Sequence, residues 1–314
     1  MLAAIAATPQ LLGSKVGAAF EGLSAASPGW LWVAGGGFAL SLVASALAWR
    51  VAGRACGSTF GRSEAVATYA CGSLVNSLTP AKLGDAVRVA LYARSLDCPQ
   101  RVWKASGIFA ALAVARCLAL GVLVAVGVAL GAFPVWMILA LAGVASLLGA
   151  AAYVTRNDTR HRAARLFDAL SELERSPRAA LTLLFWVSVS TLARVAAAAA
   201  ITAAFGISHP LLAAILIVPA LDLAGLVPLT PGNIGVASGA VAMALQARGI
   251  RITEALTAGI ALHAVEMIVG LGFGTAGSLY LVRERAPVAL RLAGAGAVVV
   301  LGFALGATMA LDIL

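Results

Sequence analysis

Leu78-Thr79-Pro80-Ala81-Lys82-Leu83-Gly84-Asp85-Ala86, or LTPAKLGDA, recurs in this chain as LTPGNIGVA at residues 229–237. Both copies read L-T-P-x-x-[LI]-G-x-A, and they begin 151 residues apart (229 − 78). Each copy interrupts an apolar region with a proline and a glycine, the two residues least suited to a helix interior. Interrupted apolar segments at matching places in two halves are typical of transporters built from repeats. We therefore expect two related halves.

The composition indicates an all-α polytopic membrane protein. Hydrophobic residues make up 61% of the 314 residues and charged residues only 11%, and the mean hydropathy is +0.98. Soluble domains carry about 25% charged residues. The net charge of +9 therefore gives no reason to expect a nucleic-acid partner. The four cysteines show no paired spacing, so we expect neither a metal site nor a disulfide framework.

The apolar runs around the two copies predict six membrane spans. About 20 apolar residues are enough to cross a bilayer. The expected spans are residues 30–49, 105–131, 134–154, 179–204, 255–281 and 292–313. Residues 1–29 are broken by prolines and charges, and we expect an N-terminal interfacial segment there.

Each LTP copy is predicted to lie in a re-entrant helical hairpin, residues 64–95 in the first half and 208–247 in the second. The apolar run before the first copy is roughly 14 residues long, too short for a full crossing. Two short tilted spans are the alternative, because both arrangements return the chain to the same side. Non-helical backbone at membrane depth must be buried in protein or line a wet cavity, so the breaks should border a site.

Counting the spans predicts an inverted repeat. Repeat 1 would cover residues 30–155, a basic cytoplasmic connector residues 156–178, and repeat 2 residues 179–314. Three full crossings per repeat insert the second repeat upside down. With both termini outside the cytoplasm, 17 of the 22 basic residues face the cytoplasm and three face outside, as the positive-inside rule prefers.

Four charged residues lie inside predicted membrane segments. Arg116, Arg194 and Glu266 sit near the middle of spans, and Asp222 lies in the second hairpin. A charge at the bilayer centre costs about 2.5–3.5 kcal/mol on insertion scales, so each is a candidate substrate-binding residue. Glu266 corresponds to position 115, beside Arg116, which predicts an ion pair across the repeats. The alternative is a structural pair that only orients helices.

His263 lies one helical turn from Glu266 on the same expected face. Together they form a candidate proton-coupling pair. The alternative for His263 is a hydrogen-bonded packing histidine.

Charged and polar residues also cluster at the two helix breaks. Asp85 and Arg88 begin a half-helix whose free N–H groups favour an anion, and Arg88 with Lys82 could hold a phosphate. The alternative is a capping pair at the cytoplasmic surface. Further candidate substrate-binding residues at the breaks are Asn76, Thr79, Pro80, Thr230, Pro231 and Asn233. No nucleophile elbow, nucleotide-binding loop or zinc spacing occurs, so we expect no catalytic residue and no cofactor.

Two short patterns carry a family resemblance. The chain reads N-x-L-x-P-x-x-x-G-[ED]-x-x-R from Asn76 to Arg88 and P-x-T-P-G-x-[LI]-G from Pro228 to Gly235. This resembles the lysylphosphatidylglycerol synthase transmembrane-region family, which includes the flippase part of bacterial multiple-peptide-resistance factors. The resemblance implies a multi-pass protein of the bacterial inner membrane that moves a polar-headed lipid between leaflets.

The chain departs from that family at three positions. Ser238 stands where many members have Glu, and Ala115 and Ala119 stand where acids often flank the arginine matching Arg116. The substrate of the best-known members is therefore not carried over.

We expect a lipid flippase with a midplane cavity between the two hairpins. Its substrate would be a phospholipid or a polyprenyl-phosphate-linked lipid with an anionic or zwitterionic headgroup. One alternative is an ion-coupled transporter of a small anionic solute. Another is a lipid-modifying membrane enzyme using Asp222, His263 and Glu266. The sequence also allows a homo-oligomer or a lipid-synthesis enzyme as partner.

Overall fold

The computed structural model describes residues 26–79, 83–98, 100–133, 172, 175–225 and 234–282, and all regular structure in them is α-helical. The described helices are α2 (Pro28–Ala55), α3 (Arg62–Leu78), α4 (Leu83–Ala93), α5 (Arg101–Ala129), α8 (Pro177–Ala204), α9 (Pro210–Ala224), α10 (Ile234–Gln246) and α11 (Ile252–Val282). The all-α prediction is confirmed for this part of the chain.

Four of these helices, α2, α5, α8 and α11, are long and apolar enough to cross a membrane. Their 28–31 residues rise about 42–46 Å at 1.5 Å per residue, which exceeds the roughly 30 Å hydrocarbon core. They coincide with four of the six predicted spans. The other two predicted spans, residues 134–154 and 292–313, lie outside the described residues, as do the interfacial segment up to residue 25 and residues 156–171, 173 and 174 of the connector.

Prolines set several helix boundaries. α2, α8 and α9 each begin with proline at the first helical position, where the missing N–H costs nothing. α3 ends at Leu78, and Thr79 adopts an extended conformation with φ −114° and ψ 148°. The following proline explains this end, because a residue before proline is pushed out of the helical region. The first LTP copy therefore breaks the helix where the sequence predicts.

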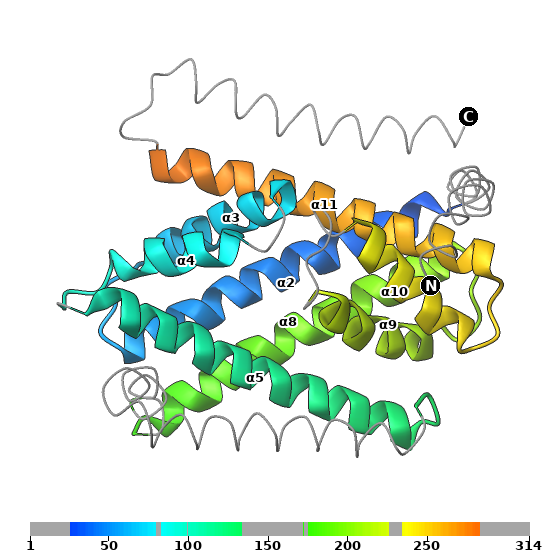
Figure 1. Ribbon diagram of the computed structural model, residues 1–314, viewed down its shortest axis with the longest axis horizontal. Coiled ribbons are helices and arrows are strands. Elements are labelled where there is room, and N and C mark those ends of the chain that lie inside the picture. The colour runs from blue at the N-terminus through cyan, green and yellow to red at the C-terminus, as the bar shows by residue number, and fades with distance from the viewer. Residues whose placement is uncertain are drawn as a thin grey trace, which may run out of the picture.

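The shorter helices form two pairs at opposite ends of the molecule. α3 packs against α4, and α9 packs against α10. In Figure 1, α3 and α4 lie at one end of the long axis and α9 and α10 at the other, with α2 and α8 running between them. The two pairs fall in the segments for which hairpins are predicted. Residues 80–82 and 226–233, between the helices of each pair, are outside the described residues.

α2 and α8, which begin 149 residues apart (177 − 28), pack most extensively against each other. The Ser27 N–H donates to the Ala204 carbonyl at 3.0 Å, and the hydroxyls of Ser41 and Ser190 lie 2.9 Å apart. Since the contact near the start of α2 is with the end of α8, the two helices run antiparallel.

Glycines bring α11 close to α3. A Cβ added to Gly274 would lie 2.5 Å from the Leu74 Cβ, and one on Gly270 would lie 3.0 Å from the Ser77 hydroxyl. Small residues of this kind let membrane helices approach closely.

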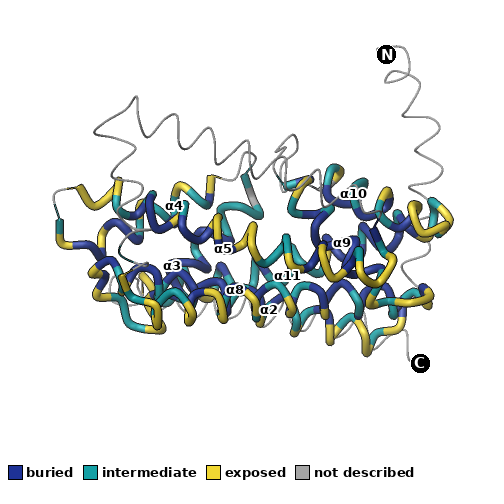
Figure 2. Tube along the Cα trace, turned by 90° about the horizontal axis from the view of Figure 1, so that it is seen from below, coloured by how far each residue is buried: buried dark blue, intermediate teal, exposed yellow. Residues whose placement is uncertain are grey.

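The apolar side chains gather in two buried clusters. One includes Ile201, Ile217 and Leu262, and the other includes Tyr92 and Ile108. Large apolar side chains on α5 and α8 are exposed instead, and Figure 2 shows exposed positions along the outer helix faces. A hydrocarbon phase would cover such a surface without cost.

Candidate functional site

A polar cavity of about 310 Å³ lies between the two apolar clusters, and all eight described helices contribute residues to its wall. This volume is at the lower end of the range for small-molecule sites in proteins. Thr79, at the end of α3, and Gly225, at the end of α9, border it. Residues of both short helix pairs therefore share one cavity wall.

The cavity brings together every predicted site residue that the structure describes. These are Asn76, Thr79, Asp85, Arg88, Arg116, Arg194, Asp222, His263 and Glu266. The predicted residues Pro80, Lys82, Thr230, Pro231 and Asn233 lie outside the described residues.

Arg88 is held inside the first helix pair and does not lie at the surface. Its side chain is 8% exposed, and its Nη1 lies 2.5 Å from the Asp85 carboxylate. Nη2 donates to the Ser73 hydroxyl at 2.7 Å and Nε to the Tyr69 carbonyl at 3.3 Å, while the guanidinium lies 3.9 Å from the centre of the Tyr69 ring. The idea of a capping pair at the cytoplasmic surface is therefore wrong. The guanidinium joins α4 to α3.

Asp85 also accepts a hydrogen bond from Asn76 Nδ2 at 3.2 Å. Gly72 and Gly84 make this close arrangement of α3 and α4 possible, because a Cβ on Gly84 would overlap the Gly72 carbonyl oxygen. The motif glycine is thus required for close backbone approach.

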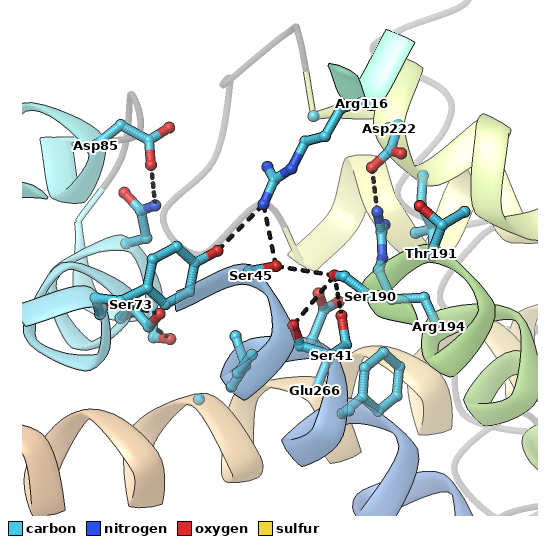
Figure 3. A pocket seen from close by; sticks show the side chains of 18 of the residues that line it. Ser41, Ser45, Ser73, Asp85, Arg116, Ser190, Thr191, Arg194, Asp222 and Glu266 are labelled. Carbon is cyan, nitrogen blue, oxygen red and sulfur yellow. Dashed lines mark hydrogen bonds and ion pairs between the residues drawn. The ribbon is translucent and has the colours of Figure 1, made fainter. Parts of the chain in front are cut away.

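Arg116 points into the cavity from α5 and has only neutral hydrogen-bond partners among the described residues. Its Nη2 donates to the Tyr69 hydroxyl at 3.2 Å and to the Ser45 hydroxyl at 3.3 Å. Figure 3 shows its guanidinium between Asp85 on one side and Asp222 on the other, joined to neither by a dashed line.

Arg194 of α8 forms an ion pair with Asp222 of α9, with Nη1 2.7 Å from Oδ1. Both side chains are partly exposed to the cavity, at 23% and 31%. The Glu266 carboxylate also acts electrostatically on Arg194. Both are predicted site residues, but the sequence does not indicate that they pair.

The predicted ion pair between Arg116 and Glu266 is not what the structure shows. Arg116 takes the two hydroxyl partners, and Glu266 lies 3.9 Å from Nδ1 of His263. The physical reason is the packing, because α5 lies mainly against α8 and α4, whereas α11 lies against α3 and α10. The two residues therefore reach the cavity from different walls.

Hydroxyl groups that are not among the predicted site residues also line the cavity. Ser45 and Ser190 lie 2.8 Å apart, and the Ser190 hydroxyl also lies 2.9 Å from that of Ser41. Ser41 and Ser45 occur four residues apart in an apolar span, and so do Tyr69 and Ser73 in α3. That spacing places each pair on one helix face and could have indicated a polar stripe.

Most charged residues in the described cavity wall form ion pairs with each other. Arg88 is paired with Asp85, and Arg194 is paired with Asp222. This leaves Arg116, with neutral partners, and Glu266, whose side chain is 43% exposed and faces His263. The cavity can therefore offer a guanidinium to an anionic group without first breaking an ion pair to a described residue. Within the same part of the chain, no group of three or more His, Cys, Asp or Glu residues has metal-binding geometry.

Comparison with known protein families matches residues 2–274 to a family described as the lysylphosphatidylglycerol synthase TM region. A search of curated proteins finds no match.

Proposed function

We propose, from the premise that the chain belongs to the lysylphosphatidylglycerol synthase transmembrane-region family, that it moves a polar-headed lipid between membrane leaflets. The family consists of membrane proteins linked to lipid metabolism or transport. The proposed substrate is a phospholipid or a polyprenyl-phosphate-linked lipid with an anionic or zwitterionic headgroup.

The observation that carries the proposal is the availability of Arg116. A guanidinium held by two neutral hydroxyls can exchange them for phosphate oxygens, and arginine binds phosphate through two parallel N–H···O bonds. Arg88 and Arg194 are less available, because each already holds a carboxylate. We therefore assign headgroup binding to Arg116 and hairpin positioning to Arg88.

The arrangement of the helices supports an inverted repeat with two re-entrant hairpins. α4 and α10 begin 151 residues apart (234 − 83), and α5 and α11 also begin 151 residues apart (252 − 101). The antiparallel packing of α2 and α8 and the opposite ends taken by the two helix pairs are what an upside-down second half requires (Figure 1).

In the proposed mechanism, the headgroup crosses the hydrocarbon core inside the cavity while its tails stay in the bilayer. The hydroxyls of Ser45, Ser190 and Thr191 line the cavity and replace hydration water around the headgroup. Exposed apolar residues on α5, including Leu118 and Val122, provide the surface along which the tails move. No bond in the lipid needs to be broken, and we propose a transporter in place of an enzyme.

We further propose that the protein lies in the bacterial inner membrane with both termini outside the cytoplasm. Its two repeats and the connector between them would have the bounds predicted from the sequence. Either a second copy of the chain or a lipid-synthesis enzyme would be a suitable partner, because a flippase receives its substrate from the leaflet where it is made.

The test is lipid translocation in proteoliposomes. Phosphatidylglycerol with a fluorophore on one acyl chain reports the leaflet when dithionite bleaches the outer copies. Arg116→Gln should slow translocation about tenfold or more, since a hydrogen bond to a charged group contributes about 1.5–3 kcal/mol. Arg101→Gln, at the exposed start of α5, is the matched control.

Two results would contradict this proposal. Equal translocation rates for Arg116→Gln and wild type would show that the headgroup does not bind Arg116 as it crosses. No movement of either phosphatidylglycerol or a polyprenyl-phosphate lipid, combined with uptake of soluble phosphate, would favour the solute transporter.

A further inference from the structure

His263 is a buried imidazole without a hydrogen-bond partner in the described structure. The residue is 7% exposed, and neither Nδ1 nor Nε2 has a partner there. Buried polar atoms are nearly always satisfied, and an exception calls for a reason. The packing-histidine alternative assumed a hydrogen bond, which the described residues do not supply. The residue lines the cavity, one turn from Glu266.

Charged and polar groups of the neighbouring helices share the cavity wall with His263. α11 packs against α3, α10, α2 and α8. Into the cavity, α3 contributes the Tyr69 phenol, α8 the Arg194 guanidinium, α2 the hydroxyls of Ser41 and Ser45, and α10 only Ala237. The remaining charged groups of the described wall are Asp85, Arg88, Arg116 and Asp222. Imidazole is a common proton carrier in proteins, and His263 is the histidine among these lining residues.

Charge balance shows what a proton on His263 would do. With His263 neutral, Arg116 and Glu266 are the two charged residues of the described cavity wall without an ion-pair partner. An anionic headgroup on Arg116 neutralises that arginine and leaves Glu266 as an unbalanced anion in a site of low dielectric constant. A proton on His263 creates an imidazolium beside Glu266, where Nδ1 already lies 3.9 Å from Oε2. Headgroup and proton thus favour each other's binding.

We infer that His263 and Glu266 carry one proton with each anionic headgroup, so that a proton gradient drives lipid movement. The inference rests on the proposed function and deepens it by naming the energy source. The proton comes from water on the more acidic side and binds an imidazole nitrogen, and the imidazolium is held by Glu266. When the headgroup leaves on the other side, the proton returns to water there, and no other group changes its charge.

The experiment measures how far a pH gradient shifts lipid between leaflets. Vesicles of phosphatidylcholine contain a trace of acyl-labelled phosphatidylglycerol, and potassium with valinomycin holds the membrane potential at zero. One proton per lipid allows up to about tenfold leaflet asymmetry for each pH unit of gradient. Wild type should approach that ratio.

His263→Gln keeps a hydrogen-bonding side chain that cannot take a proton. It should remove the response to the gradient while the label equilibrates more slowly than in wild type, and Glu266→Gln should likewise remove the response. His209→Asn is the control, because His209 is exposed at the start of α9 with φ 54°, a conformation that Asn tolerates.

Three outcomes would overturn one or both proposals. A wild-type protein that moves lipid but ignores the gradient overturns the coupling and leaves the proposed function standing, whether or not the variants fold. A gradient response that survives in a folded His263→Gln protein overturns the role of His263. No lipid movement at all overturns both proposals.

Discussion

Replacing Asp85 with Ala should destabilise the first helix pair through the buried arginine that it leaves behind. The Arg88 side chain is 8% exposed, and its Nη1 lies 2.5 Å from Asp85 Oδ1. Removing one partner of a buried ion pair costs about 3–5 kcal/mol. Because the Asp85 side chain is 25% exposed, water screens part of this, and we expect a loss of about 2–3 kcal/mol. At about 2–4 °C per kcal/mol for a large domain, Tm in detergent should fall by about 4–12 °C.

The double variant Asp85→Ala/Arg88→Met separates pairing from packing. It contains no unpaired guanidinium, so its loss of unfolding free energy should be smaller than the sum of the losses in the two single variants. Thermal unfolding in detergent of the four proteins gives the coupling free energy. Glu254→Ala, in an exposed ion pair of the same i,i+3 spacing, is the control and should leave Tm unchanged. Effects at Asp85 and Arg88 that add within about 0.5 kcal/mol would refute a coupled buried pair.

Gly274→Ala should lower stability by about 1–3 kcal/mol, because its Cβ would meet α3, whereas Gly272→Ala, with no described atom within 4 Å, should be neutral in the same unfolding assay. Burial, with a smaller contribution from Glu172, raises the pKa of the Cys56 thiol to about 12, so thiolate is scarce below that pH. Maleimide at pH 8 should therefore leave Cys56 unmodified in a mass spectrum until the protein unfolds, and fast labelling of folded protein would contradict this. Tyr69→Phe removes the phenol that holds the cavity arginine of α5, and lipid translocation should slow several-fold with Tm nearly unchanged; an unaltered rate would show that this hydrogen bond does not position the arginine.

Local chemistry made the helix breaks and the long helices predictable. Pro80 forces Thr79 out of the helical region whatever surrounds it, and the apolar run of α5 spans a bilayer by length alone. The pairing of charges was not predictable in the same way. Equal depth in two repeats suggested that Arg116 meets Glu266, but depth does not fix the direction in which a side chain leaves its helix.

The role of Arg88 could not be predicted from the sequence, for a related reason. An Asp and an Arg three residues apart look alike in sequence whether the pair lies at a surface or between two helices. Only the packing of α4 on α3 buries the guanidinium against Tyr69 and Ser73. The Ser45–Ser190 contact likewise depends on which faces of α2 and α8 meet, and that is a tertiary property.

The central claim is that the headgroup passes through the cavity, and cross-linking from the headgroup tests it most directly. A variant with its native cysteines replaced would carry Ser45→Cys in the cavity or, as the control, Val122→Cys on the exposed face of α5. A phospholipid with a maleimide on its headgroup should label Ser45→Cys, and excess phosphatidylglycerol should slow that labelling. Val122→Cys should react little, because only lipid tails reach it. Labelling of Val122→Cys alone, in a protein that still translocates lipid, would contradict a path through the cavity.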